Sequence, residues 1–173
     1  ITHEPSSPTY RRARLQLSAP PEHYGAFRPT PEVLAAWDRT CEISQILRAR
    51  IVLLQCPASF TPTEKHIHNL NTFLSTIDRR GLTLAWEPRG DWPPDLIREL
   101  CQTHQLIHAV DPFQGLPVTT GVAYFRLHGR TGYRYRYAEG DLTQLLDWCQ
   151  TFEEVYCLFN NVSMWEDATR LLE

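Results

Sequence analysis

The chain has 173 residues, enough for one domain with a sizeable hydrophobic core and too few for two ordinary domains. Its 42% hydrophobic and 21% charged residues are typical of a soluble globular protein, and a net charge of −3 argues against a protein that coats nucleic acid non-specifically. No apolar stretch approaches the roughly 18 residues that span a bilayer, and no signal peptide is visible. We therefore expect a cytoplasmic protein with no membrane partner.

The first thirty residues are predicted to form an irregular connection. Residues 4–30 contain five prolines and a basic cluster of Arg11, Arg12 and Arg14. Pro31 then begins a predicted helix that reaches about Arg48. The apolar run Ile51–Gln55 predicts a strand that is buried on both faces.

A second helix is predicted to begin at Thr63, which can cap it, and to end near Gly81. Its apolar stripe consists of Ile67, Leu70, Leu74 and Ile77. The remaining predicted elements are a strand at 82–87, a helix from 93 to about 101, strands at 106–111 and 123–128, a helix over 142–149, a strand at 155–161 and a helix at 165–172.

The strand at 123–128 alternates apolar and polar side chains with period two. One face carries Ala123, Phe125 and Leu127, and it is expected to pack against a helix. The other face carries Tyr124, Arg126 and His128. Because a buried arginine or histidine is costly unless it is paired, this face is either a structural ion pair or part of a ligand site.

Five strands that alternate with helices predict right-handed βαβ units and a parallel sheet. Ligands bind at the carboxyl ends of the strands in such sheets. All five predicted strands end in polar residues, namely Gln55, Glu87 with Arg89, Asp111, Arg126 with His128, and Asn160 with Asn161. Each residue alone is more often structural, but polar ends on every strand predict a shared site.

The motifs at these strand ends resemble the YecE-like family, known as domain of unknown function 72. They are Leu54-Gln55-Cys56-Pro57, Trp86-Glu87-Pro88-Arg89, Arg126-Leu127-His128-Gly129 and Phe159-Asn160-Asn161, and Thr2-His3 is similar to an early element of that family. The resemblance implies a parallel (β/α) TIM-type barrel of the α/β class. This chain would supply about the last five strand–helix units, as one domain over residues 1–173.

The resemblance also implies that earlier strands of the family precede Thr2-His3, one with a glycine–tryptophan pair and one with a lysine. Five strands cannot close a barrel of this type. The outer edge of the strand at 51–55 is therefore expected to pair with a second chain, with residues before Ile1, or with the segment before Pro31. Pro88 departs from the family pattern, which more often has an aromatic residue between the glutamate and the arginine.

The leading hypothesis is an enzyme, or a descendant of one, that binds a phosphate- or carboxylate-bearing small molecule. The predicted catalytic residues are Glu87, Asp111 and His128, with carboxylate acid–base chemistry and His128 as a proton carrier. The predicted ligand-binding residues are His3, Gln55, Arg89, Arg126, Arg130, Asn160 and Asn161. Arg126 is the predicted anion anchor and the predicted ion-pair partner of Glu87.

The sequence names no cofactor and favours no metal. Glu87, Asp111, His128 and His3 are ligand types for a divalent cation, but two arginines at the same strand ends would repel it. His66 and His68 diverge on a helix and do not form a metal pair.

The five cysteines, Cys41, Cys56, Cys101, Cys149 and Cys157, form no CxxC pair and are predicted to be reduced core residues.

Two other classes of function stay open. A nucleic-acid-binding or nucleic-acid-processing protein would use the arginine- and tyrosine-rich segment 130–137 to contact backbone and bases. That segment is equally well explained as a solvated loop. A non-catalytic scaffold would use the polar strand ends only as a buried network.

Overall fold

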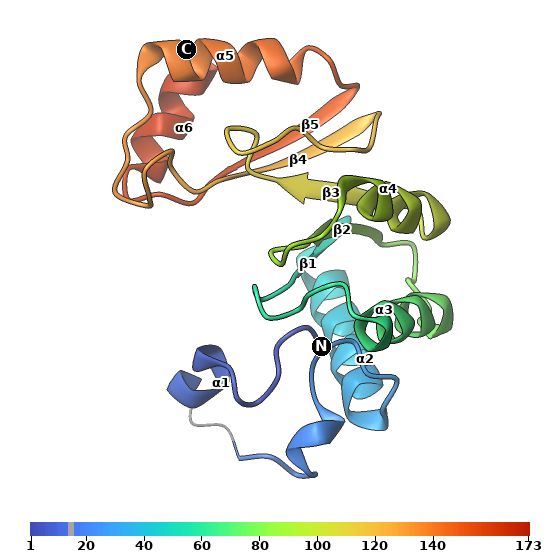
Figure 1. The fold of residues 1–173 in the computed structure, drawn as a ribbon. Coiled ribbons are helices and arrows are strands. Elements are labelled where there is room, and N and C mark those ends of the chain that lie inside the picture. The colour runs from blue at the N-terminus through green and yellow to red at the C-terminus, as the bar shows by residue number, and fades with distance from the viewer. Residues whose placement is uncertain (14–15) are drawn as a thin grey trace. The chain divides into compact units, whose positions relative to one another are not determined.

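The computed structural model describes residues 1–13 and 16–173 (Figure 1), so Arg14 of the basic cluster lies outside the described residues. The chain divides into two compact units, 1–106 and 107–173, which are described in turn. The single domain expected from the sequence stays a prediction. Among the described residues, no helix combines the length and apolar character needed to cross a membrane.

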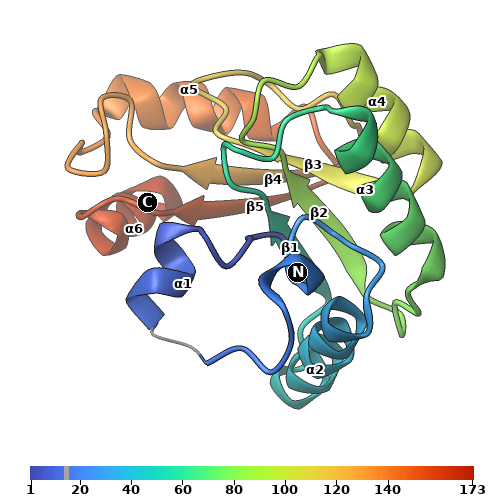
Figure 2. The ribbon, with the colours of Figure 1, turned by 60° about the horizontal axis from the view of Figure 1, so that its bottom comes forward.

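The N-terminal unit contains alternating helices and strands. They are α2 (Pro31–Leu47), β1 (Ile51–Gln55), α3 (Glu64–Thr76), β2 (Thr83–Glu87) and α4 (Pro94–Thr103). β1 and β2 are parallel, and Gln55 lies opposite Glu87 at their carboxyl ends. The amino-terminal residues lie beside β1 and α2 (Figure 2). The predicted order and type of these elements are confirmed.

The segment 4–30 is less irregular than expected. It contains the short helix α1 (Pro8–Ala13) and the 3₁₀ turn η1 (Pro21–His23). In both cases a proline lies at the first helical position, where the missing N–H costs no hydrogen bond. Arg11 N donates to the Ser7 carbonyl oxygen at 3.2 Å in the first turn of α1. From the sequence, these prolines are expected only to break regular structure.

The strand β1 is less buried than its sequence predicts. Leu54 is the one fully buried residue in it, and the other four are partly exposed. β1 pairs with β2 on one side, and no described strand of this unit pairs with its other side. Partial exposure is expected at such an edge. The additional strand for that edge stays a prediction.

Thr63 caps α3 as predicted, since its side chain accepts a hydrogen bond from the backbone of His66 at 3.2 Å. The end of this helix differs from the prediction. Ile77 already has an extended backbone, and Gly81 lies four residues later with φ of +82°. Gly81 therefore serves the turn into β2, not the cap of α3.

The C-terminal unit contains three parallel strands and two helices. β3 (Leu106–Val110) pairs with β4 (Val122–Leu127), which pairs with β5 (Glu154–Phe159). α5 (Glu139–Cys149) precedes β5, and α6 (Met164–Leu172) follows it. The structure thus confirms a parallel α/β fold within each unit. Closure into a TIM-type barrel stays a prediction.

The predicted alternation of β4 is confirmed. Ala123, Phe125 and Leu127 are fully buried in one core cluster with Leu142 and Leu145 of α5. Tyr124, Arg126 and His128 belong to the other face by period two. Leu146 of α5 is 44% exposed and lies outside this cluster.

A loop, residues 111–121, replaces a helix between the parallel strands β3 and β4. His108 of β3 anchors this loop. Its ring Nδ1 accepts a hydrogen bond from Val118 N at 3.2 Å, and its backbone N donates to Thr119 Oγ1 at 3.1 Å. Burial lowers the pKa of His108 to about 4, so the ring is neutral at pH 7.

Candidate functional site at the strand ends

Glu87 and Arg89 form an ion pair at the end of β2. Arg89 Nε lies 2.9 Å from Glu87 Oε1, and Glu87 is only 6% exposed. The loop that follows is held tightly, because a Cβ on Gly90 would lie 2.5 Å from the carbonyl oxygen of Phe60. The ion pair shows that the Arg89 side chain reaches Glu87 despite the intervening Pro88.

His3 is held by close packing of residues 1–4 against residues 25–27. The backbone N–H groups of Ala26 and Phe27 donate to the carbonyl oxygens of Thr2 and Ile1, both at 3.1 Å. A Cβ on Gly25 would lie 2.3 Å from the His3 carbonyl oxygen, so only glycine fits there. Burial, the N-terminal ammonium and Arg89 together lower the pKa of His3.

A cavity of about 430 Å³ lies within the N-terminal unit, between the chain start, α2 and β1. His3 and Gln55 both line it, so the structure brings these two predicted residues together. Thr2 and Thr40 add hydroxyl groups to the wall. Thr40 is not among the predicted site residues, because a single threonine within an amphipathic helix carries no signal of its own.

Asp111, His128 and Asn160 come together in the C-terminal unit, from the ends of β3, β4 and β5. The Asp111 carboxylate accepts backbone hydrogen bonds from Phe113 and His128, both at 3.1 Å. The Asn160 amide nitrogen lies 3.1 Å from His128 Nδ1. Three consecutive strand ends thus fix one imidazole, through its backbone and through its ring.

Arg126 belongs to the same face of β4 as His128, two residues earlier. Beneath it on that face, Tyr124 stacks on Tyr156 of β5 with ring centroids 5.9 Å apart. The opposite face of β4 is fully apolar. This places a guanidinium, an imidazole and two phenol rings on one side of the sheet and leaves none of them on the other.

Arg130 is engaged within the loop that follows β4. It pairs with Asp141 at 2.6 Å, and its guanidinium lies 5.4 Å from the Phe113 ring centre. Tyr135 Oη also donates to Asp141, at 2.6 Å. Burial raises the pKa of Asp141, but the hydrogen bonds from Tyr135 and Arg130 outweigh it and lower the pKa overall. Asp141 therefore organises the loop, and the sequence analysis did not single it out.

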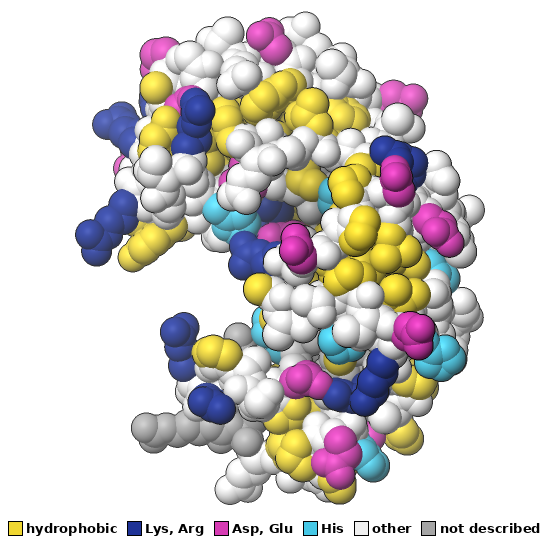
Figure 3. Space-filling model, viewed as in Figure 1, with side chains coloured by type: hydrophobic (Ala, Val, Ile, Leu, Met, Phe, Trp, Pro, Cys, Tyr) yellow, Lys and Arg dark blue, Asp and Glu magenta, His cyan; other side chains and the backbone are white. Residues whose placement is uncertain are grey.

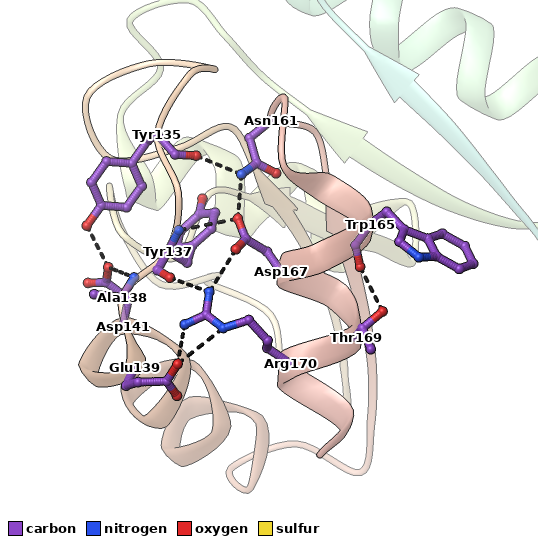
Figure 4. A network of polar contacts seen from close by, with 10 residues as sticks. All are labelled: Tyr135, Tyr137, Ala138, Glu139, Asp141, Asn161, Trp165, Asp167, Thr169 and Arg170. Carbon is purple, nitrogen blue, oxygen red and sulfur yellow. Dashed lines mark hydrogen bonds and ion pairs between the residues drawn. The ribbon is translucent and has the colours of Figure 1, made fainter.

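Asn161 belongs to a buried network that joins the loop to α6 (Figure 4). Its amide nitrogen donates to the Tyr135 carbonyl and to Asp167 Oδ2, both at 2.7 Å. Asp167 is fully buried and also accepts from Arg170 at 3.0 Å. Arg170 in turn contacts Glu139 of α5. These contacts give Asn161 a framework role, and its predicted role in ligand binding stays a prediction.

The strand-end residues therefore form two sets, one in each unit. His3, Gln55, Glu87 and Arg89 belong to the first, and Asp111, Arg126, His128 and Asn160 to the second. The predicted ion pair between Glu87 and Arg126 joins residues of different units and stays a prediction. Within the described parts of the chain, no three His, Cys, Asp or Glu side chains gather in a metal-binding group.

Acidic and basic side chains are interspersed on the face drawn in Figure 3. Among the residues that the structure describes, this face shows no broad field of a single sign. A mixed surface agrees with the net charge of −3. Recognition of an anion would therefore depend on local side chains, such as those at the strand ends, and not on the charge of the whole protein.

Comparisons with known proteins place the fold. A crystal structure from Thermotoga maritima is 23% identical in sequence and matches with a TM-score of 0.60. The match covers 82% of this chain and 62% of the Thermotoga chain. A second crystal structure, from Enterococcus faecalis, is 18% identical in sequence and matches with a TM-score of 0.61. That match covers 90% of this chain and 67% of the Enterococcus chain. Both are described as DUF72 family proteins, and at these identities they show the fold alone.

The chain thus spans less than two thirds of the Thermotoga protein. No curated protein matches the sequence. The model of the family described as protein of unknown function DUF72 matches residues 12–173, nearly the whole chain. The chain therefore belongs to the DUF72 family, the family that its strand-end motifs resemble.

Proposed function

We propose that the carboxyl ends of β3, β4 and β5 bind the anionic group of a small molecule, a phosphate or a carboxylate. One observation carries the proposal: Asn160 and Asp111 hold His128 from two sides, next to Arg126 on the same face of β4. An imidazole that is fixed by two neighbouring strands is organised before any ligand arrives. Such preorganisation lowers the cost of binding.

The contact with Asn160 also sets the hydrogen on the imidazole. With the Asn160 amide NH₂ as the donor, His128 Nδ1 accepts, and we assign the hydrogen of the neutral ring to Nε2. That Nε2–H is a donor for an anionic oxygen. Arg126 supplies a forked pair of donors suited to phosphate or carboxylate.

The activity that we propose is an enzymatic step on this ligand. The His128 Nε2–H can stabilise or protonate an oxygen on which negative charge develops. Asp111 has both oxygens engaged by backbone donors, so we assign it the positioning of His128. Acid–base roles for Glu87 and Asp111, ligand roles for His3, Gln55, Arg89 and Arg130, and the cytoplasmic location stay predictions.

A titration with inorganic phosphate tests the binding proposal. We expect amide resonances of residues 126–129 to shift in two-dimensional NMR, and Arg126→Gln to weaken the affinity by at least about tenfold, a loss of about 1.4 kcal/mol. His128→Gln should weaken it less, because glutamine keeps a donor.

Arg134→Gln is the matched control for that titration. Arg134 is also an arginine of the C-terminal unit, but it is exposed on the loop and no described contact fixes its side chain. The control should bind phosphate as the unmodified protein does. Equal binding by the Arg126 and Arg134 variants, or shifts confined to residues 130–137, would show that the strand ends are not the anion site.

A second candidate function rests on the exposed side chains of the loop. Tyr133 is 62% exposed, and Arg134 and Arg136 are exposed beside it. Aromatic rings with nearby arginines are typical of surfaces that bind single-stranded nucleic acid. The same variants separate the two functions. Oligonucleotide binding that weakens with salt and with Arg134→Gln, but not with Arg126→Gln, would favour this second candidate.

A further inference from the structure

Two of the five cysteines lie against each other in the C-terminal unit. Cys149 is the last residue of α5, Cys157 lies in β5, and their sulfur atoms are 3.7 Å apart. Both are partly exposed, whereas Cys41, Cys56 and Cys101 are buried. This pair is therefore the part of the cysteine set that small molecules in solution can reach.

The surroundings of the pair favour a bond between the two sulfurs. Cys157 lies opposite Phe125 in the register of β4 and β5, on the face that packs against α5. Both cysteines contact the same core cluster, which holds their backbones in place. A disulfide needs a sulfur–sulfur distance of about 2.0 Å, so the two sulfurs must come closer by about 1.7 Å to form the bond.

We propose that Cys149 and Cys157 form a reversible intramolecular disulfide by exchange with a small disulfide such as oxidised glutathione. The Cys149 thiolate attacks one glutathione sulfur and expels the other glutathione as a thiolate. Cys157 then loses its proton and attacks the Cys149 sulfur, which expels the second glutathione. The two protein thiols are oxidised, and the one glutathione disulfide is reduced to two thiols.

A hydrogen bond joins the two thiols, and either sulfur can be its donor. In this pair the contact with Cys157 lowers the pKa of Cys149. The same hydrogen bond, together with burial, raises the pKa of Cys157. We assign Cys149 as the nucleophile and Cys157 as the resolving thiol, an order that the single variants test.

The bond would join the end of α5 to β5. β5 leads directly into Asn160, whose amide lies 3.1 Å from His128. Oxidation would therefore restrain the strand that carries one of the two side chains fixing His128. The pair would link the redox state of the surroundings to the strand ends of this unit.

The experiment equilibrates the folded chain with mixtures of reduced and oxidised glutathione. Free thiols are then blocked under acid quench, and the peptides are mapped. We expect two of the five thiols to disappear together in one cross-linked pair, Cys149 with Cys157. The equilibrium constant should be at least about tenfold larger for the folded chain than for the chain in urea, because folding holds the sulfurs together.

Single variants test the order of attack. Cys157→Ser should accumulate a glutathione adduct on Cys149, and Cys149→Ser should gain no comparable adduct on Cys157. Cys101→Ser, a buried cysteine elsewhere, should form the bond as the unmodified chain does. A cross-link that forms equally well in urea, a cross-link to another cysteine, or single adducts on the unmodified chain would overturn the proposal.

Discussion

Replacing Asp167 with alanine is expected to lower the free energy of unfolding of the C-terminal unit by about 3–5 kcal/mol. Asp167 is fully buried, and three donors converge on its carboxylate. They are Asn161 Nδ2 at 2.7 Å, Arg170 at 3.0 Å and the backbone N of Tyr137 at 3.3 Å. Alanine removes all three acceptor contacts at once and leaves a small cavity.

The loss of stability should appear first in the segments that the Asp167 network connects. Tyr137 N–H and Asn161 belong to the loop after β4 and to the turn after β5, so both segments lose an anchor on α6. Hydrogen exchange should accelerate at residues 135–142 and 160–170 before it does elsewhere. Urea unfolding followed by hydrogen exchange and mass spectrometry measures both the stability and its location.

Glu166→Ala is the matched control. Glu166 is the preceding residue of α6 and also carries a carboxylate, but it is exposed. Its removal should change stability by less than about 1 kcal/mol, mostly through the helix dipole. Asp167→Asn should fall between the two, because it keeps one acceptor oxygen. If Asp167→Ala were no more costly than Glu166→Ala, the network would not hold the loop to α6.

Acidification from pH 6.5 to pH 4 is expected to cost about 3 kcal/mol of stability through His108 alone. Burial lowers the pKa of His108 from 6.5 to about 4 in the folded state. Between these values the unfolded chain binds a proton that the folded chain does not. The stabilisation is therefore complete above pH 6.5 and is lost as pH falls through pH 4.

The geometry gives the same sign. Val118 N–H donates to His108 Nδ1, so a proton on that nitrogen would place two donors face to face. The slope of unfolding free energy with pH should reach about 1.4 kcal/mol per pH unit near pH 5. Urea unfolding at a series of pH values measures it.

His108→Asn isolates this contribution. Asparagine places an acceptor oxygen close to the position of Nδ1 and does not titrate, so the loop keeps its hydrogen bond. The variant should be less stable at pH 7, because it fills less space, and should have a flatter pH profile. Burial also lowers the pKa of His3 and His104, which add slopes of the same sign in both proteins. Identical slopes in variant and unmodified protein would rule out His108 as the acid-sensitive group.

Local patterns in the sequence determined much of this protein. Period two in β4 separated Ala123, Phe125 and Leu127 from the polar face, and the structure confirms the apolar side as core. Thr63 marked the start of α3, and the alternation of elements predicted parallel pairing. The motifs at the strand ends led to the DUF72 family. These features depend on residues that are neighbours along the chain, so they can be read without a fold.

Only the tertiary structure decided which polar residues hold the loops and helices together and which lie at the candidate site. Asn160 and Asn161 are adjacent and chemically identical, yet one contacts His128 and the other is buried against Asp167. Arg130 pairs with Asp141, eleven residues later along the chain. Asp141, Asp167 and His108 carried no sequence signal, because their partners come from distant segments. The burial of a polar side chain and the identity of its hydrogen-bond partner depend on packing between elements. No periodicity along the chain encodes that packing.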